Sequence, residues 1–359
     1  MSSVAGDTNS VARLWTESTH DAIRRDFPAP TEHARNLWHL SALMWDAWSA
    51  YTPGTDSYFD AELSPSEPDE RVAAIEEAIS FGAHRLLSHR YSFAIGDTES
   101  LADFDSLLAD LCFDPPADVE PGSPAAVGLA IANVAIQFGN VDGSSERTRY
   151  IDLSYRPVNE PLVVASDEIE MMDPNQWQPL ELAERFTQNG QSQGPGVQAF
   201  IGSQWGSVTS FALPEPDDRG ITIDPGPPPL LGSETEGVFI AGAMQVIEHS
   251  NTLGGDDGDR LVDIPPGVRG NKIVGANGGS GWPENPATGE AYAANEVPLA
   301  DYGRSVAEFW ADGPDSETPP GHWNTLAIAV TYGSSRQPSS RKRPVGRHRA
   351  AMGDLWRCG

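Results

Sequence analysis

The pattern that most constrains the fold is a wide apolar helix between residues 31 and 51. Spacings of three and four residues align apolar side chains in two adjacent rows, which are Leu37, Met44, Trp48 and Tyr51 in one row and Trp38, Ala42 and Trp45 in the other. An apolar face this wide has to be covered by other elements on several sides. We therefore expect this segment to be the central, most buried helix of a helical bundle.

Four further segments before residue 140 carry helical periodicity. The first is capped by Asn9 or Ser10, and the others run over about 67–88, 98–111 and 124–138. Ser123 followed by Pro124 at one end, and Gly139 at the other, are typical start and stop signals of a helix. The sequence therefore predicts a mainly α fold, with an N-terminal helical bundle over residues 1–139.

The rest of the chain divides into three parts by composition. Residues 140–300 are rich in Gly, Pro and Trp, which predicts a long irregular region with short strands or turns. A helical pattern returns in residues 301–330 and runs into a Pro-rich turn. Residues 331–359 form a basic tail without helix or strand periodicity, and we expect it to be disordered or the product of a frameshift.

Charge separates this tail from the body of the protein. The tail has seven basic residues and one acid, a net charge of +6, whereas the other 330 residues carry 16 basic and 51 acidic side chains, a net charge of −35. Such a body repels phosphate backbones, so we expect no nucleic-acid partner. Only two of the basic residues are Lys, which suggests a halophilic protein as a hypothesis; a melting temperature that does not rise with salt would contradict it.

The lengths of the apolar stretches bear on the cellular location of the protein, and its cysteine count bears on redox and zinc chemistry. No stretch has the apolar length of a signal peptide or a membrane span, so we expect a cytoplasmic protein that does not bind membranes. The two cysteines, Cys112 and Cys358, are too few for a disulfide framework or a cysteine zinc site.

Histidines are the other candidates for a metal or acid–base site. His33 and His39 lie on the wide-faced helix, while His84 and His89 are five residues apart, a spacing that does not stack them on one helical face. We expect these four to be hydrogen-bonded imidazoles and not metal ligands.

Several long segments of unusual composition resemble the vanadium-dependent haloperoxidase-like proteins of the type 2 phosphatidic acid phosphatase superfamily. They are residues 25–48, 85–91, 155–164, 173–180, 198–213 and 226–232, and they extend over the chain from about Ser10 to Leu326. The resemblance implies an all-helical fold, and an activity in which peroxide oxidises halide at a bound vanadate cofactor held by Lys, Arg and His side chains.

The family's three site motifs are not intact in this chain. Lys-x6-Arg-Pro fails because Gly279 follows seven residues after Lys272, and Ser-Arg-x5-His fails because Arg347 stands where the His belongs. Residues 319–322, Pro-Pro-Gly-His, match Pro-Ser-Gly-His except that Pro320 replaces the Ser that donates to the oxyanion. His322 is therefore a weak catalytic candidate, and we interpret it first as part of a structural turn.

Three functions follow as alternatives. The first is a haloperoxidase-like protein that is truncated before the vanadate site, inactive alone and without bound vanadate. The second is an acid phosphatase-type hydrolase with the same oxyanion site. The third is a non-catalytic helical interaction module, which could form a homo-oligomer through the exposed apolar surface of the bundle.

Overall fold

The computed structural model describes residues 10–59, 61–64, 66–114, 119–164, 166, 171–213, 218, 226–254, 258–265, 284–285, 287–310 and 315–332. These residues are mainly helical, as predicted, and their strands are short. The chain divides into two compact units, one formed by residues 1–224 and 312–359 and the other by residues 225–311. No helix in the described part of the chain is long and apolar enough to cross a membrane.

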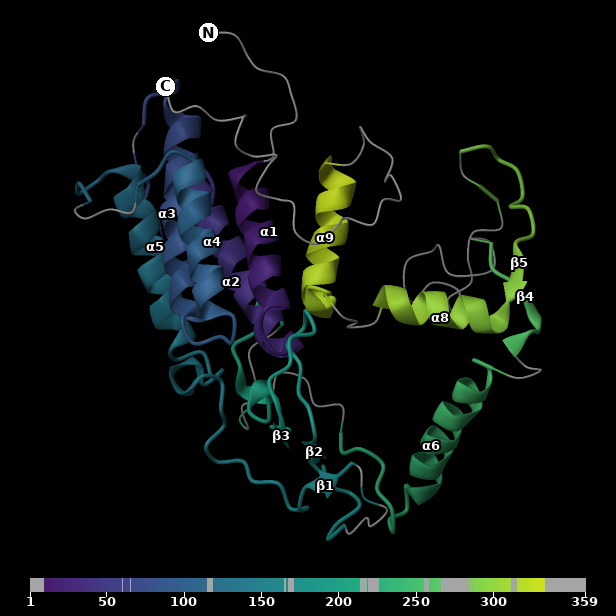
Figure 1. Ribbon diagram of the computed structural model, residues 1–359. Helices are drawn as coiled ribbons and strands as arrows, with labels where there is room; N and C mark the ends of the chain where they lie inside the picture. The colour runs from purple at the N-terminus through teal and green to yellow at the C-terminus, as the bar shows by residue number, and fades with distance from the viewer. Residues whose placement is uncertain are drawn as a thin grey trace. The chain divides into compact units, whose positions relative to one another are not determined.

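Among the described residues, six helices belong to the larger unit. They are α1 (Val11–Arg24), α2 (Pro30–Ser49), α3 (Arg71–Tyr91), α4 (Asp97–Asp110), α5 (Pro124–Gly139) and α9 (Thr318–Tyr332). Figure 1 shows α1 to α5 packed side by side, with α9 alongside them although it comes last in the sequence. The core includes Trp15, Leu43, Leu86 and Phe104, which are almost fully buried. Burial of these side chains is the main force that holds the helices together.

The predicted helix starts have a clear physical basis. The hydroxyl groups of Ser10 and Ser123 accept hydrogen bonds from the backbone N–H groups of Arg13 and Ala126, which otherwise lack helical partners. Pro124 occupies the first position of α5, where no N–H is needed. The central helix of the prediction is α2, which packs against α1, α3, α5 and α9.

Helices α3 and α5 approach each other closely at two glycines. A Cβ atom on Gly128 would overlap the carbonyl oxygen of Ala78, and one on Gly82 would lie 3.0 Å from the carbonyl oxygen of Gly128. The absence of side chains at both positions lets the two backbones come into contact.

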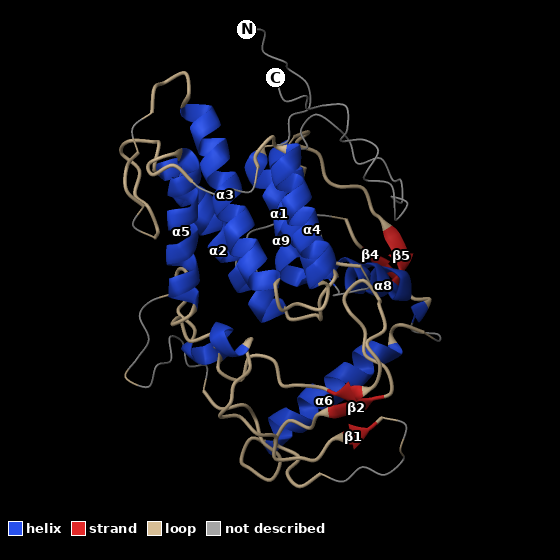
Figure 2. Ribbon diagram, turned by 60° about the vertical axis from the view of Figure 1, so that its left-hand side comes forward, coloured by secondary structure: helices blue, strands red, loops and turns tan. Residues whose placement is uncertain are grey.

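After α5 the larger unit consists mostly of loops (Figure 2). Its strands β1 (Leu162–Val163), β2 (Leu180–Leu182) and β3 (Gly196–Val197) form a small sheet in the order β1-β2-β3, parallel between β1 and β2 and antiparallel between β2 and β3. Two 3₁₀ turns, η1 (Glu146–Thr148) and η2 (Trp205–Ser207), interrupt the loops.

The smaller unit adds a helix to residues 140–300, for which the sequence predicts an irregular region with short strands or turns. It contains α6 (Glu236–Asn251), the antiparallel pair β4 (Leu261–Asp263) and β5 (Glu296–Pro298), and α8 (Leu299–Trp310). Because α6 is apolar on nearly all sides, it has no polar stripe to give a helical period, and flanking Gly and Pro residues obscure it further.

The Pro-rich turn expected within residues 301–330 is also wrong, because Pro319 and Pro320 form part of the first turn of α9. Proline is tolerated there since the first N–H groups of a helix have no intrahelical acceptor. Most of the predicted tail, residues 333–359, lies outside the described residues.

Candidate functional site

The largest concentration of buried charge lies among α2, α3 and the segment that follows α5. We define the buried charge network as Arg35 and His39 of α2, Arg90 of α3, and Asp142 and Glu146. All five side chains are 2% exposed or less. Charges this deep in a protein persist only when they are paired.

Arg35 connects both acids. Its Nε donates to Asp142 Oδ2 and its Nη2 to Glu146 Oε2, each at 2.6 Å, while Nη2 also donates to the carbonyl oxygen of Gly139 at 3.0 Å. The guanidinium also lies 5.6 Å from the ring centroid of Tyr150. Arg35 therefore ties α2 to the end of α5 and to the loop beyond it.

The second arginine determines the tautomer of His39. Arg90 Nη2 lies 2.5 Å from His39 Nδ1 and, as a guanidinium nitrogen, can only donate, so Nδ1 is the acceptor. The proton of the neutral ring is then on Nε2, which lies 3.9 Å from Asp142 Oδ2. Burial, followed by the charges of Arg90 and Arg35, strongly lowers the pKa of His39 and keeps the ring neutral.

Glu146 receives cationic partners from two helices. Burial alone would raise its pKa, but a hydrogen bond from His89 and the charges of Arg90 and Arg35 lower the pKa to about 2. His89 Nε2 lies 3.3 Å from Glu146 Oε1, and Arg90 Nε lies 3.5 Å from the same oxygen. His89 is one-third exposed and forms the solvent-facing end of these contacts.

The backbone that carries these acids is strained. Ser145, Arg149 and Tyr150 all have φ near +60°, a conformation that costs a non-glycine residue about 1 kcal/mol or more. The turn brings Glu146 and Tyr150 into the bundle, where the ion pair of Arg35 with Glu146 and its hydrogen bond to the Tyr150 hydroxyl offset the strain.

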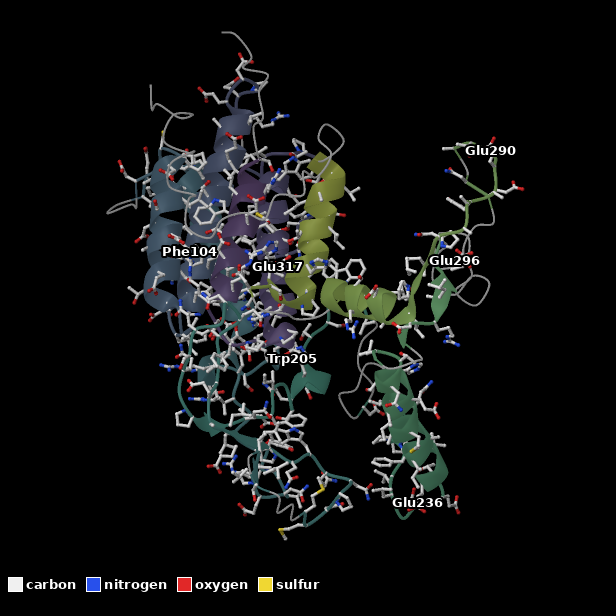
Figure 3. All side chains as sticks on the ribbon, turned by 45° about the vertical axis from the view of Figure 1, so that its right-hand side comes forward. Phe104, Trp205, Glu236, Glu290, Glu296 and Glu317 are labelled. Atoms are coloured by element: carbon white, nitrogen blue, oxygen red, sulfur yellow. The ribbon has the colours of Figure 1, made fainter. Side chains whose placement is uncertain are left out.

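A second polar cluster joins the start of α9 to α1 and α2. We define the α9 anchor as His20 and Arg24 of α1, His33 of α2, and Glu317 and Thr318. Arg24 Nη2 donates to Glu317 Oε2 at 2.6 Å, and His33 Nδ1 lies 3.0 Å from Thr318 Oγ1. Figure 3 shows Glu317 near the start of α9, beside α1.

His322, the weak catalytic candidate, lies next to this anchor on α9. Its Nδ1 is 3.4 Å from Glu317 Oε1, and its Nε2 is buried. A general acid or base must present a ring nitrogen to a reacting group, whereas the Nε2 of His322 is buried and its Nδ1 lies against the Glu317 carboxylate.

The four histidines that sequence analysis assigned to ordinary hydrogen bonding all have polar neighbours. His33 contacts Thr318, His39 contacts Arg90 and His89 contacts Glu146, while His84 Nε2 lies 2.7 Å from Asp105 Oδ1. In the part of the chain that the structure describes, no group of three or more His, Cys, Asp or Glu side chains could hold a metal ion.

Neither cluster fits a vanadate oxyanion. In the buried charge network, the two arginines are balanced by Asp142 and Glu146, so no net positive charge remains to stabilise an added anion. In the α9 anchor, Arg24 is paired with both Glu317 and Asp21. Both lysines, Lys272 and Lys342, lie outside the described residues.

Sequence reasoning missed the buried charge network because the two acids that pair with Arg35 lie 107 and 111 positions away. One signal was available: Arg35 lies three residues before Trp38, in line with the apolar row of Trp38, Ala42 and Trp45, where a charge requires a buried partner. Nothing local identifies Asp142 and Glu146 as the partners among so many acidic residues.

Comparison with known proteins gives matches only at the level of solved structures. No protein-family model and no curated protein sequence matches the chain. The crystal structure of an apo-type bacterial vanadium-dependent chloroperoxidase matches with a TM-score of 0.48 and 17% identity, over 64% of this chain and 50% of that one. The holo-type bacterial enzyme matches with a TM-score of 0.46 and 14% identity, over 71% of this chain and 55% of that one. The chain thus spans about half the length of these structures.

Proposed function

We propose that this chain is a haloperoxidase-like helical protein that does not oxidise halide by itself. The observation that carries the proposal is the neutralisation of buried cations: Arg35 by Asp142 and Glu146, and Arg24 by Glu317. The sequence segments that resemble the haloperoxidase-like family support the first half of the proposal. The frameshift explanation for residues 331–359 remains a prediction, which translation of the gene in its other two frames would test.

The purified full chain, incubated with orthovanadate, bromide and hydrogen peroxide, is expected to brominate a phenol dye no faster than vanadate alone. An oxyanion site needs cationic donors that are not already paired with carboxylates. The rate is followed by dye absorbance, with an active vanadium-dependent chloroperoxidase as positive control. Line broadening of the ⁵¹V resonance measures binding of vanadate separately from turnover.

Bromination above the background, or saturable vanadate binding, would contradict the proposal. Turnover of an aryl phosphate by the same preparation would instead favour the acid phosphatase-type alternative, because the two activities share the same oxyanion chemistry. We expect neither reaction.

A second candidate is a non-catalytic interaction module that pairs with another copy of the chain. It is favoured by α6, an apolar helix that nevertheless has no buried residue. The side chains of Val238, Val246 and Ile247 are each more than half exposed. No charged side chain interrupts residues 237–247, so two such helices can approach without the repulsion that the acidic surface imposes elsewhere.

For this candidate, light scattering of the full chain is expected to give a dimer that Val246→Glu converts to a monomer. The matched control is Glu248→Gln, which changes a charge on the same helix without adding one to the apolar surface. A monomer that binds no hydrophobic dye would remove this alternative.

A further inference from the structure

The helix α9 is attached to the bundle differently from α1 to α5. It packs against α1 and α2, but its start is held by polar contacts and its apolar side chains are only partly covered. Trp323 and Val330 are 57% and 79% exposed. The apolar core of the unit is formed by α1 to α5 and the segments near them, so α9 contributes little to it.

A tight turn adds to the polar attachment. Residues 187–190 lie between the end of α1 and the segment before α9, because the N–H of Asn189 donates to the carbonyl oxygen of Arg24. Gln188 accepts from the N–H of Asp315 through its carbonyl oxygen and donates from its side chain to Ser316 Oγ. Hydrogen bonds and ion pairs therefore account for most of the connection at this end of α9.

Two buried histidines lie directly under the start of α9. His33 Nδ1 contacts Thr318 Oγ1, and a Cβ atom on Gly321 would lie 3.4 Å from Cδ2 of His20. Both histidines are 3% exposed. His20 Nε2 has no hydrogen-bond partner among the described residues, so a proton added there gains no hydrogen bond while α9 is docked.

We propose that α9 is a proton-sensitive latch, which mild acid releases from α1 and α2 while the bundle α1–α5 stays folded. This inference does not depend on the proposed function. It rests on the geometry: α9 covers two titratable side chains, His20 and His33, and polar contacts such as the Arg24–Glu317 ion pair hold α9 in place.

The direction follows from proton uptake. Burial lowers the pKa of His20 and of His33 to about 4. Release of α9 exposes both rings and returns each pKa towards its ordinary value of 6.5, so the released state binds more protons below that pH. Docking is therefore strongest above pH 6.5 and weakens as the pH falls from 6.5 towards 4.

The charged groups around the two histidines do not reverse this direction. Burial is the largest influence on His20; Glu317 opposes it by raising the pKa and Arg24 adds to it, whereas the shift of His33 comes from burial alone. Glu32, next to His33 on α2, is half-buried, and desolvation followed by the charge of Asp26 raises its pKa to about 8, which keeps it neutral through the acid range.

Glu317 itself acts at lower pH. Burial would raise its pKa, but Thr325 and Arg24 lower it below its ordinary value of 4.5. A carboxyl group with a lowered pKa contributes stability that is present above 4.5 and is lost only as the pH falls through its pKa in the docked state. Any weakening of α9 docking between pH 6.5 and 4.5 is therefore assigned to the two histidines and not to Glu317.

Hydrogen–deuterium exchange of the full chain across pH 7.5 to 5, corrected for the intrinsic pH dependence of exchange, tests the latch. Each histidine weakens docking by about 30-fold at pH 5, so amide protection in α9 is expected to fall by up to about 10³-fold. Peptides from α3 and α5 are expected to keep their protection. Constant protection of α9, or loss in step with α3 and α5, would overturn the proposal.

The double variant His20→Gln/His33→Gln is expected to remove the pH dependence of α9 protection, since neither side chain titrates. The control is His84→Gln, because His84 pairs with Asp105 away from α9 and its loss should leave the pH dependence unchanged. A pH dependence that survives in the double variant would refute the latch.

If the double variant does not fold, Arg24→Gln provides an independent test. This substitution removes the ion pair between Arg24 Nη2 and Glu317 Oε2, which are 2.6 Å apart, but leaves both histidines in place. Protection of α9 should then be lower at every pH and should still fall with acid. Unchanged protection would contradict a polar attachment and with it the latch.

Discussion

Replacement of Arg35 by Met lowers the free energy of unfolding by about 3–5 kcal/mol, the largest effect that we expect from a single substitution. The side chain donates to Asp142 and Glu146 at 2.6 Å, and all three groups are almost completely buried. Met has a similar length but no charge, so the variant leaves two carboxylates in the core without their principal partner. Urea denaturation monitored by circular dichroism measures the loss.

The matched control is Arg13→Gln. Arg13 forms an i,i+4 pair with Glu17 at the surface, with side chains 24% and 43% exposed. Such pairs contribute about 0–1 kcal/mol because water screens them. A loss from Arg35→Met no larger than that from Arg13→Gln would contradict the description of the network as a buried structural element.

Acid unfolding gives a second readout of the same variant. The pKa of Glu146 is about 2, held there against burial by His89, Arg90 and Arg35, so its stabilisation is complete above its ordinary pKa of 4.5 and is lost as the pH falls from there towards 2. Removal of Arg35 raises this pKa. The variant is therefore expected to lose less stability than the native chain as the pH falls from 4.5 towards 2, so the difference in stability between the two narrows in acid.

Gly128→Ala is expected to destabilise the bundle by about 1–3 kcal/mol. Two effects compete, since Ala favours a helix over Gly by about 1 kcal/mol, whereas a Cβ atom at this position overlaps the carbonyl oxygen of Ala78. The overlap dominates because the obstacle is backbone of α3 and cannot rotate away. Thermal denaturation followed by circular dichroism measures the change.

Gly237→Ala is the appropriate control for Gly128→Ala. It is also a helical glycine, in α6, and nothing lies within 4 Å of the position of its Cβ atom. Only the helix preference acts there, so no destabilisation is expected. If Gly128→Ala were as well tolerated as Gly237→Ala, the close contact of α3 and α5 would be wrong.

Local signals account for the parts of the fold that could be predicted. Ser10 and Ser123 mark helix starts because a hydroxyl group can satisfy a backbone N–H two or three residues ahead, and this chemistry depends on neighbours in the sequence. The same holds for the periodic apolar rows of α2. The α6 helix escaped prediction because an almost uniformly apolar segment has no period to detect.

The candidate sites were much less predictable. His322 is a candidate because it belongs to a four-residue motif, whereas in space its Nδ1 lies 3.4 Å from Oε1 of Glu317, a member of the α9 anchor. The partners of Arg35 lie more than 100 positions away, and a chain with 52 acidic residues offers many equivalent choices. Which carboxylate is buried with which arginine depends on how the helices pack.

The sequence by itself determined the mainly helical class, the start of α1 and of α5 and the acidic character of the surface, because each depends on residues a few positions apart or on composition alone. The tertiary structure alone decided that Arg35, Arg90, Asp142 and Glu146 neutralise one another, and that α9 covers His20 and His33. Burial and charge pairing depend on distances in space, and a linear pattern carries no information on them until α2, α3 and α9 are packed together.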